Sequence, residues 1–316
     1  MSNSADQHTE SIKAAALEAG FDAVGIAPPD ISVEEQAFFS EWLESGYHAG
    51  MGYMERNVDK RREPDKLFPG VKSVIVLLKS YHSDSQQDIP YKVSRYALGR
   101  DYHKRLKKRM KGLQAKIQEI IGQEFRSRPF TDSAPVFERS LAVKAGLGRP
   151  GKNTSLIHPR LGSFVFIAEL FTDIELTFDQ PSNRTICGRC TRCIDACPTN
   201  AISAEGVNSE RCISYHTIET RDDIPQWIQD RLNGWVFGCD ICQEVCPYNK
   251  KPLQMDDADF QPGPHLEKIN ADFLSGITDD DFVKVFGGTP MMRTGRDKLL
   301  RNIKAVKDGS KKPGSQ

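Results

Sequence analysis

CGRCTRCIDACP, residues 187–198, is the stretch that decides the fold of the second half of this 316-residue chain. Its cysteines follow the order C-x2-C-x2-C-x3-C-P, in which three close thiolates hold one [4Fe–4S] cubane and the fourth reaches across to another. A second run, CDICQEVCP (239–247), repeats the last three cysteines of this pattern, but Val236 occupies the place of the first. The two runs predict two clusters, and the second run lacks one ligand.

The chain has eight cysteines, and the only one outside the two runs is Cys212. Two [4Fe–4S] clusters need eight thiolates, so Cys212 is predicted to replace the missing ligand. Crossed ligation, as in bacterial ferredoxins, assigns the first cluster to Cys187, Cys190, Cys193 and Cys246. It assigns the second cluster to Cys197, Cys212, Cys239 and Cys242. Clusters held in this way lie close enough to exchange electrons.

Two other interpretations of the cysteines remain open. Pairs spaced C-x2-C also suit tetrahedral zinc, although zinc ribbons do not need the C-x3-C-P ending twice. The clusters can also serve only to brace the fold, although paired cubanes usually form a path for electrons. A small electron carrier, however, does not need 186 residues in front of its clusters. The sequence therefore favours a redox module joined to a larger domain that uses the electrons.

The N-terminus indicates the cellular compartment, and the charge balance bears on nucleic-acid binding. MSNSADQHTE (1–10) is polar and lacks the pattern of a secretory signal, and the longest apolar runs, such as VIVLL (74–78), cannot span a bilayer. We therefore expect a cytoplasmic protein without a membrane segment. In that reducing compartment clustered cysteines bind metal more often than they form disulfides. Lys plus Arg equals Asp plus Glu at 43 each, so no global charge points to nucleic acid.

Helix and strand patterns alternate along the first half of the chain. Apolar side chains that recur at helical spacing predict helices at residues 9–20, 34–46 and 103–124, the last of them amphipathic. Apolar runs rich in β-branched and aromatic residues predict strands at FDAVGIA (21–27), KSVIVLLKSY (72–81) and SFVFIAELF (163–171). This alternation predicts an α/β (α+β) domain.

The patterns divide the chain into four parts. We predict an α/β domain at 1–180, a two-cluster ferredoxin-like domain at 181–255, a small helical region at 256–306 and a tail at 307–316. A break rich in Pro, Ser and Asn separates the first two parts. The tail, KDGSKKPGSQ, is polar and is predicted to be disordered.

Ordered segments along nearly the whole chain resemble the epoxyqueuosine reductases, cobalamin-dependent iron–sulfur enzymes of queuosine synthesis in tRNA that are related in plan to reductive dehalogenases. The segments are MGYMERN (51–57), KSVIVLLKSY, SRYALGRDYHKRLKKRM (94–110), FTDSAPVFERSLAVKAGLG (130–148), GKNTSLIHPRLGSF (151–164), both cysteine runs and RCISYHTIE (211–219). The resemblance implies a cobalamin-binding front domain and a C-terminal HEAT-like piece. It also implies the reduction of epoxyqueuosine to queuosine at the wobble position of tRNA by cobalamin that is reduced through the clusters. The epoxide oxygen leaves as water.

The resemblance also implies site residues. Asp132 matches the family's proton donor, and a carboxyl in a partly desolvated pocket can hold its proton near neutral pH. From the residues alone, Asp-Ser-Ala-Pro also predicts an N-cap for a helix that begins near Ala134, and the two roles do not exclude each other. The implied cobalamin contacts are Arg56, Ala97, Asp132, Ser214 and Asp240.

No histidine stands in the D-x-H-x-x-G context in which a histidine replaces the lower ligand of cobalamin. The resemblance therefore implies a cobalt without a protein histidine, and the seven histidines are interpreted as structural or exposed.

Two basic segments are candidates for contact with tRNA. HKRLKKRMK (103–111) carries six cations: Lys104, Arg105, Lys107, Lys108, Arg109 and Lys111. A second group near the C-terminus contains Arg293, Arg296, Lys298, Arg301 and Lys304. From the residues alone a solvated helix face is the more common explanation, whereas the implied substrate favours contact with its phosphates.

The glycine-rich segment at 146–154 comes close to a P-loop. Asn153 follows Lys152, however, and the segment follows a helical pattern instead of a strand, so we predict no nucleotide triphosphate site. Its glycines are expected to let the backbone approach the corrin or turn tightly.

Two alternative functions remain open beside the implied one. One is a non-catalytic ferredoxin-type electron carrier whose front domain docks a redox partner. The other is a cobalamin-dependent reductase of a small electrophile, similar to a dehalogenase. For the implied enzyme we expect a flavodoxin or ferredoxin system as electron donor and a monomeric protein.

Overall fold

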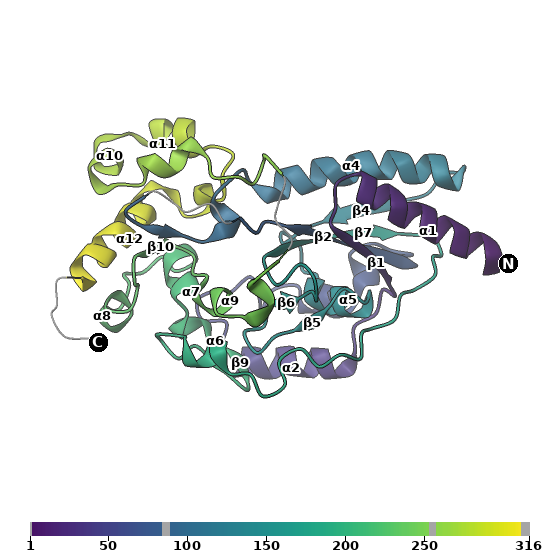
Figure 1. Cartoon of the computed structure of the whole chain (residues 1–316), viewed down its shortest axis with the longest axis horizontal. Helices are drawn as coiled ribbons and strands as arrows, with labels where there is room; N and C mark the ends of the chain where they lie inside the picture. The colour runs from purple at the N-terminus through teal and green to yellow at the C-terminus, as the bar shows by residue number, and fades with distance from the viewer. Residues whose placement is uncertain (1, 84–88, 253–256, 311–316) are drawn as a thin grey trace.

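The structure, a computed structural model, describes residues 2–83, 89–252 and 257–310. A four-stranded sheet with the order β1-β2-β7-β4 forms the centre of the first half (Figure 1). The strands are β1 (Ala23–Ala27), β2 (Ser73–Ser80), β7 (Val165–Thr172) and β4 (Ser127–Phe130). All three pairings are antiparallel, so the predicted strands exist and the domain is of the α+β kind.

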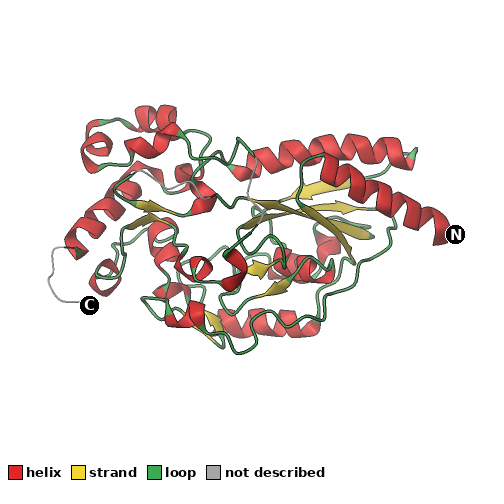
Figure 2. Ribbon diagram, viewed as in Figure 1, coloured by secondary structure: helices red, strands yellow, loops and turns green. Residues whose placement is uncertain are grey.

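Helices cover both faces of this sheet (Figure 2). Helices α1 (Ser2–Glu18) and α4 (Tyr102–Ile121) lie side by side on one face, and α5 (Glu138–Lys144) lies on the other. In α4 the side chain of Asp101 accepts the amide of His103 at 3.0 Å, and Gly122 ends the helix with φ +69°. The amphipathic helix predicted at 103–124 is therefore present with slightly different ends.

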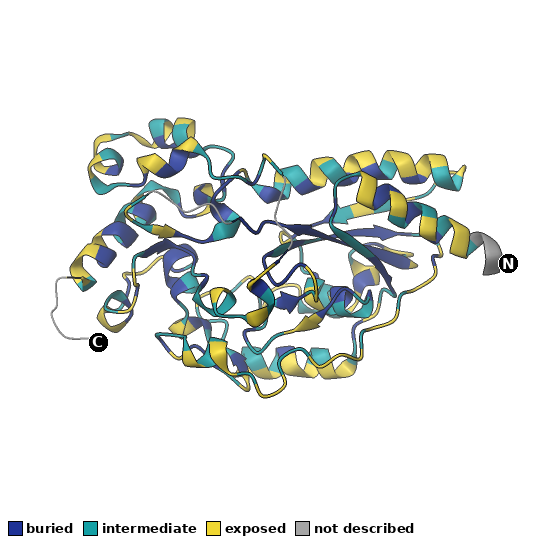
Figure 3. Ribbon diagram, viewed as in Figure 1, coloured by how far each residue is buried: buried dark blue, intermediate teal, exposed yellow. Residues whose placement is uncertain are grey.

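Strand β2 explains why the sheet is buried on both sides. All eight of its residues are buried, and their side chains alternate between the two faces (Figure 3). Ile75 and Leu77 pack with Leu106 and Met110 of α4, whereas Val76 packs with Leu141 and its neighbours in α5. The sheet thus stands between two apolar layers. This packing holds the ends of the strands in place, and the site residues lie near those ends.

Short elements fill the rest of the first half. Helix α2 begins with a capping box between Ser32 and Glu35, close to the helix predicted at 34–46. The short elements are α2 (Val33–Glu44), α3 (Val58–Arg62), η1 (Pro64–Lys66), β3 (Lys92–Val93), η2 (Arg95–Ala97), β5 (Arg149–Pro150) and β6 (Leu156–Ile157).

The cysteine region is made of turns and short elements. Helices α6 (Arg192–Asp195) and α9 (Ile241–Glu244) each contain one cysteine of a run and pack against each other. The remaining elements are β8 (Ile202–Ser203), β9 (Gly206–Val207), η3 (Ser209–Arg211), α7 (Ile213–Ile218), α8 (Gln226–Gln229), β10 (Trp235–Phe237) and η4 (Pro247–Asn249). The two runs therefore meet in space although 40 residues lie between Pro198 and Cys239.

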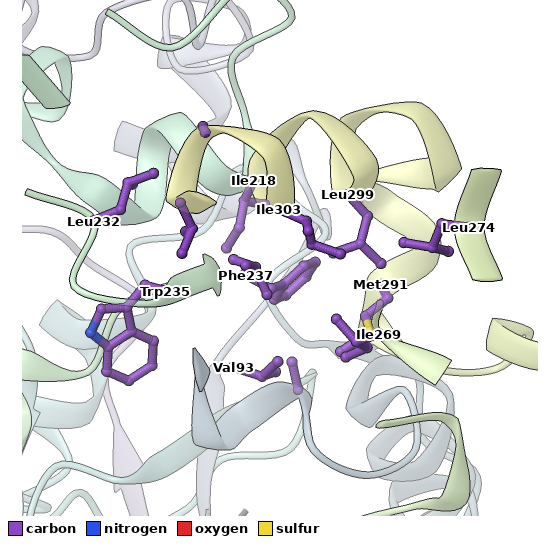
Figure 4. Close-up of a cluster of buried hydrophobic side chains, with 14 of the residues drawn as sticks. Val93, Ile218, Leu232, Trp235, Phe237, Ile269, Leu274, Met291, Leu299 and Ile303 are labelled. Carbon is purple, nitrogen blue, oxygen red and sulfur yellow. The ribbon is translucent and has the colours of Figure 1, made fainter. Parts of the chain in front are cut away.

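The C-terminal part is helical. It contains η5 (Pro264–Lys268), α10 (Ala271–Gly276), α11 (Asp279–Phe286), η6 (Pro290–Arg293) and α12 (Gly295–Gly309). Helix α12 packs on β10, α7, α8 and α10. Figure 4 shows the apolar core between them, in which Phe237 meets Leu299 and Ile303. Because α12 continues to Gly309, the tail predicted to be disordered from 307 starts in a helix; residues 311–316 lie outside the described residues.

One connection was not expected from the sequence. Strand β3 pairs in parallel with β10, and Val93, Ala97 and Leu98 belong to the C-terminal apolar core. A segment within the range 1–180 is therefore built into the core of the C-terminal part. The predicted domain ranges do not include this contribution of residues 93–98 to the C-terminal core, and the ranges stay a prediction. No helix within the described residues combines the length and the apolar character needed to cross a bilayer.

Candidate functional site

The first set of thiols gathers around the turn that begins at Cys187. None of the eight cysteines forms a disulfide, and each is half-buried. Burial, together with the neighbouring thiols of Cys187 and Cys190, raises the pKa of Cys193. Burial and the same two thiols raise the pKa of Cys246. The structure thus brings together the four cysteines predicted for the first cluster.

The second set lies deeper in the protein. Burial raises the pKa of Cys212, and the nearby thiol of Cys197 adds to this shift. Burial, with Cys212 and Cys242 close by, raises the pKa of Cys239. Burial also raises the pKa of Cys242 to about 12, with further contributions from Cys212 and from Cys193 of the first set. Cys212 is therefore placed beside Cys239 and Cys242, and Cys193 and Cys242 link the two sets.

The surroundings of the thiols suit metal-bound sulfur. The backbone amide of Ala201 donates to Cys197 Sγ at 3.3 Å, and backbone amides of Tyr215 and Ser214 hydrogen-bond to Cys212. In the described part of the chain no three His, Cys, Asp or Glu side chains converge on one point as a single metal ion requires. Cubane ligands bind four different irons, so they need not converge. Iron would remove the protons that burial otherwise keeps on these sulfurs.

Asp132 lies two residues after the end of β4 in a left-handed conformation, with φ +51°. Its backbone amide donates a hydrogen bond to the carboxylate of Glu138, the first residue of α5. The N-cap of α5 is Phe137, and no side chain caps the helix. The predicted cap at the start of a helix near Ala134 is therefore wrong, because the helix begins four residues later and the Asp132 side chain points elsewhere.

The Asp132 carboxyl belongs to a hydrogen-bonded group at the start of α4. Tyr102 Oη donates to Asp132 Oδ2, and His103 Nε2 lies 3.6 Å from the same oxygen. On its other side, His103 Nδ1 lies 2.8 Å from Asp101 Oδ1. Two carboxylates thus flank one imidazole, and a tyrosine hydroxyl completes the group.

These contacts correct the expectation that Asp132 holds its own proton. Burial by itself would raise the pKa of Asp132, but the hydrogen bonds from His103 and Tyr102 outweigh it and lower the pKa. Burial also opposes a charge on His103, yet its hydrogen bonds to Asp101 and Asp132 raise the pKa of His103 to about 9. At neutral pH the proton of the pair therefore rests on His103, and Asp132 is a carboxylate.

The surroundings of Asp132, called the recess below, are open to solvent. The Asp132 side chain is 54% exposed. Tyr53, Tyr96 and Arg293 stand close enough to Asp132 to interact with it electrostatically. Arg293 is held by Glu219 at 2.8 Å, and its guanidinium lies 5.9 Å from the centre of the Tyr53 ring. The C-terminal part thus contributes a charge to the recess.

Two further carboxyls lie behind Asp132. Burial, and then the charge of Asp132, raise the pKa of Glu138 to about 8. Glu169 on β7 is fully buried, and within the described residues neither of its carboxyl oxygens has a hydrogen-bond partner. Burial raises the pKa of Glu169 well above its ordinary value, so this carboxyl is neutral at pH 7. A neutral carboxyl adds no negative charge behind the Asp132–His103 pair.

The predicted cobalamin contacts are dispersed. The Asp240 side chain is fully buried, where its Oδ1 accepts the hydroxyl of Ser94 and its Oδ2 accepts the amide of Arg95 at 2.7 Å. Ala97 is also fully buried, in the C-terminal apolar core. Neither side chain faces open space. Asp240 holds the segment 94–97 through its two hydrogen bonds, and Ala97 anchors the segment in the apolar core. Ser214 is half-buried beside Cys212, and Arg56 is exposed.

The glycine-rich segment belongs to the cysteine site. The Asn153 side chain hydrogen-bonds to Cys242, and Asn153 is 6% exposed. Gly148 has φ +151°, and a Cβ there would stand 2.4 Å from the carbonyl oxygen of Ile157. The glycine thus lets the backbone just before β5 approach the Ile157 carbonyl of β6.

The two basic segments differ. On α4, Lys104, Lys107, Lys108 and Lys111 are exposed, whereas Arg105 and Arg109 pair with Asp259 and Asp257. In the C-terminal group most donors are occupied: Arg293 by Glu219, Arg296 by Asp279, Lys298 by the Ile218 carbonyl and Arg301 by carbonyls of residues 216, 220 and 222. Most donors of the second segment are therefore used within the fold, and its contact with tRNA stays a prediction.

Sequence reasoning missed the partners of Asp132. His103 was interpreted as structural or exposed, and Tyr102 and Glu138 were not singled out. All three stand inside the segments that carried the resemblance, and His103 follows Asp101 by two residues at a helix start. That spacing was the available signal, because an aspartate cap brings its carboxylate to the imidazole.

The charge on His103 gives a prediction for pH titration. In NMR, the His103 ring is expected to titrate near 9, and in Asp132→Asn this pKa should move toward the ordinary 6.5. Because the folded pKa lies above the unfolded value, the pair stabilises the fold fully below about pH 6.5, and this contribution is lost as pH rises through about 9. Titration of the wild-type ring near 6.5 would show that Asp132 and Asp101 do not hold the proton.

Family profiles match two parts of the chain. The profile described as epoxyqueuosine reductase QueG, DUF1730, covers residues 61–133. The profile described as a 4Fe-4S double cluster binding domain covers residues 186–249. The second match includes all eight cysteines, and the first includes Asp132 and the start of α4.

Whole-chain comparisons agree with the profiles. An epoxyqueuosine reductase of Leadbetterella byssophila is 44% identical over 95% of this chain and 99% of its own length. The crystal structure of a selenomethionine-labelled epoxyqueuosine reductase superposes with a TM-score of 0.87 at 29% identity, over 95% of this chain and 81% of that one. An epoxyqueuosine reductase with an epoxyqueuosine-modified tRNA-Tyr stem loop gives 0.85 at 28% identity, over 95% and 80%.

Proposed function

The chain belongs to the epoxyqueuosine reductase family and is an oxidoreductase, and we propose that it reduces epoxyqueuosine at the wobble position of tRNA to queuosine. In this proposal electrons pass through two [4Fe–4S] clusters to cobalamin, and the epoxide oxygen leaves as water. A relative that was crystallised with an epoxyqueuosine-modified stem loop supports the choice of substrate.

The observation that carries the proposal is the position of Asp132 relative to the second set of thiols. Tyr96 is half-buried and links the two: its ring centre lies 6.1 Å from that of Tyr102, which donates to Asp132, and 6.1 Å from that of Phe237, two residues before Cys239. A proton-transfer group and an electron-transfer group thus border one region. Reduction of an epoxide requires both.

The reaction balances with two electrons and two protons. The epoxide C–O bonds break, a carbon–carbon double bond forms, and the oxygen leaves as water. As negative charge develops on that oxygen, the proton that His103 holds passes through the Asp132 carboxylate to it, and Tyr102 holds this carboxylate in position. Solvent supplies the second proton and returns the first to His103. The lowered pKa of Asp132 fits this relay, because a strongly basic alkoxide takes a proton from the pair.

Cobalamin, when bound, supplies a reduced cobalt that attacks carbon, which no protein side chain can do. The residues fit such a group, because the recess has an acid–base pair at Asp132 and deep thiols near Tyr96. Of the proposed contacts Ser214 and Arg56 keep side-chain atoms accessible, while Ala97 and Asp240 position the backbone of 94–97. In the described part of the chain the histidine nearest the recess, His103, is already held by two carboxylates.

Contact with tRNA is proposed for the exposed lysines of α4. Lys107 Nζ donates to Ser133 Oγ at 3.0 Å, so the helix face begins next to the Asp132 loop. Lys104, Lys108 and Lys111 continue this face along the helix. A folded tRNA is held mainly through its phosphates while the modified base leaves the stack, and this face fits the first role.

Charge removal on α4 should therefore weaken tRNA binding. At low salt, the double variant Lys108→Ala with Lys111→Ala should bind tRNA more weakly than the wild type does. The slope of log affinity against log salt concentration should become shallower by about 1 per lysine. The measurement is a binding titration at several salt concentrations. The control is Lys284→Ala on α11, an exposed lysine paired with Asp281. An unchanged salt slope in the double variant would remove this face from the interface.

The proposed function is tested by product analysis. The protein is reconstituted anaerobically with iron and sulfide, supplied with cobalamin and a strong reductant, and incubated with tRNA that carries epoxyqueuosine. Mass spectrometry should find the nucleoside with one oxygen atom fewer, and omission of cobalamin should prevent this loss. An unchanged tRNA with both cofactors bound would instead favour an electron carrier.

A further inference from the structure

We propose that the surface over the first set of thiols is the docking site of a small acidic one-electron carrier protein. This surface, called the entry face below, is formed by α6, α9 and their flanking turns, with the cations Arg189, Arg192, Lys250 and Lys251. The inference rests on the proposed function, since it names the partner that supplies its electrons.

Depth distinguishes the two sets of thiols. The neighbours of the first set in the sequence are exposed, among them Arg189, Thr191 and Arg192. By contrast, Ile213, Gly238 and Asp240, which adjoin Cys212 and Cys239, are buried. The rate of electron transfer falls exponentially with distance, so an external donor reaches the shallow set first. Cys193 and Cys242 then connect the shallow set with the deep one.

The entry face carries cations that the fold itself does not use. Arg189 and Arg192 flank Cys190 in the first run, and Lys250 and Lys251 follow the second run. All four are exposed, and among the described residues none of them forms an ion pair. This contrasts with the C-terminal cations, most of which bind carboxylates or carbonyls of the protein.

The carboxylates of this face do not cancel the charge. Glu244 is bound by Arg95 at 2.7 Å, and Asp195 accepts the hydroxyl of Thr191 at 2.8 Å. Four unpaired cations therefore face one carboxylate that has no cationic partner among the described residues. Unpaired surface charge of one sign attracts a partner of the opposite sign and speeds its association.

The shape of the entry face also suits a protein partner. An open hollow of about 500 Å³ is lined by Arg192, Asp195, Ala196, Glu244, Val245 and Lys250. Two of these lining residues, Ala196 and Val245, are apolar, and the other four are charged. Transient protein interfaces likewise combine a small apolar area with polar side chains.

The entry face lies apart from the basic face of α4. In the view of Figure 1, α4 lies at the upper right, whereas α9 lies near the middle of the molecule and α6 below it. We therefore expect that a carrier and a tRNA can bind at the same time. In each encounter the carrier loses one electron and the iron–sulfur group held by the first set gains it, so no bond forms or breaks.

The test measures binding by the reconstituted protein, with an acidic flavodoxin and an acidic ferredoxin as probes. Calorimetry at low and at high salt should find micromolar binding that weakens as salt rises. Lys250→Glu combined with Lys251→Glu should lower the affinity by about tenfold or more. The matched control is Lys304→Glu with Lys307→Glu on α12, which reverses two exposed charges elsewhere.

Two further readouts make the result decisive. Iron content and tRNA affinity should be unchanged in the Lys250/Lys251 variant, which separates a carrier surface from an RNA surface. The inference would be overturned if neither probe bound the wild type, or if the α12 control lost as much probe affinity as the Lys250/Lys251 variant. It would also be overturned if that variant lost tRNA affinity and kept its affinity for the probes. Because no tRNA product is measured, this result is independent of the test of the proposed function.

Discussion

Asp132→Asn is expected to lower the rate of epoxide reduction by about 10²- to 10⁴-fold while iron content and cobalamin binding stay unchanged. Asparagine keeps the size of the side chain and can still pair with Tyr102, but it cannot pass on the proton that His103 holds. The loss should appear in single-turnover experiments at saturating tRNA, because the missing group acts on the reacting oxygen and not on the affinity.

Its control is Asp272→Asn, which removes an exposed carboxylate at the start of α10. This variant should react at the wild-type rate. Wild-type turnover in Asp132→Asn would show that the carboxyl only helps to hold Tyr102 and His103 in place, and the relay through His103 would have to be abandoned.

Cys212→Ser is the second variant with a large expected effect. We expect about half of the wild-type iron, one remaining cluster and no detectable tRNA product, because Cys212 completes the deep set beside Cys239 and Cys242. Electrons could then enter at the shallow set but not cross to the recess. Iron analysis and electron paramagnetic resonance of the reduced protein measure this loss.

The comparison variant is Cys190→Ser in the shallow set. It should also lose about half of the iron, but its remaining cluster is the deep one, so the two variants should give different spectra. A Cys212→Ser protein with full iron content would mean that another group completes the second cluster.

The elements that the sequence predicted best are those with a strong local pattern. Strand β2 is a continuous apolar run with both faces buried, and α4 has apolar side chains at helical spacing between an aspartate cap and Gly122. The prediction that Cys212 joins the second run followed from ligand counting, and the structure places it beside Cys239. Such features depend on few residues that are close in sequence or on a fixed stoichiometry.

The features that were missed depend on distant parts of the chain. The pairing of β3 with β10 joins residues about 140 positions apart. Arg293 reaches the recess only because Glu219 holds it there, and no local pattern indicates this. The direction of the Asp132 pKa also required the position of His103, since burial alone favours the opposite direction.

The central claim is that eight thiolates form two neighbouring iron–sulfur clusters that serve the Asp132 recess. Its most direct measurement is the metal and sulfide content of the anaerobically purified wild-type protein, with the electron paramagnetic resonance spectrum of its reduced form. The account predicts about eight irons and about eight sulfides per chain, with signals of two clusters that interact magnetically. Zinc in place of iron, or about four irons in a fully loaded chain, would contradict it.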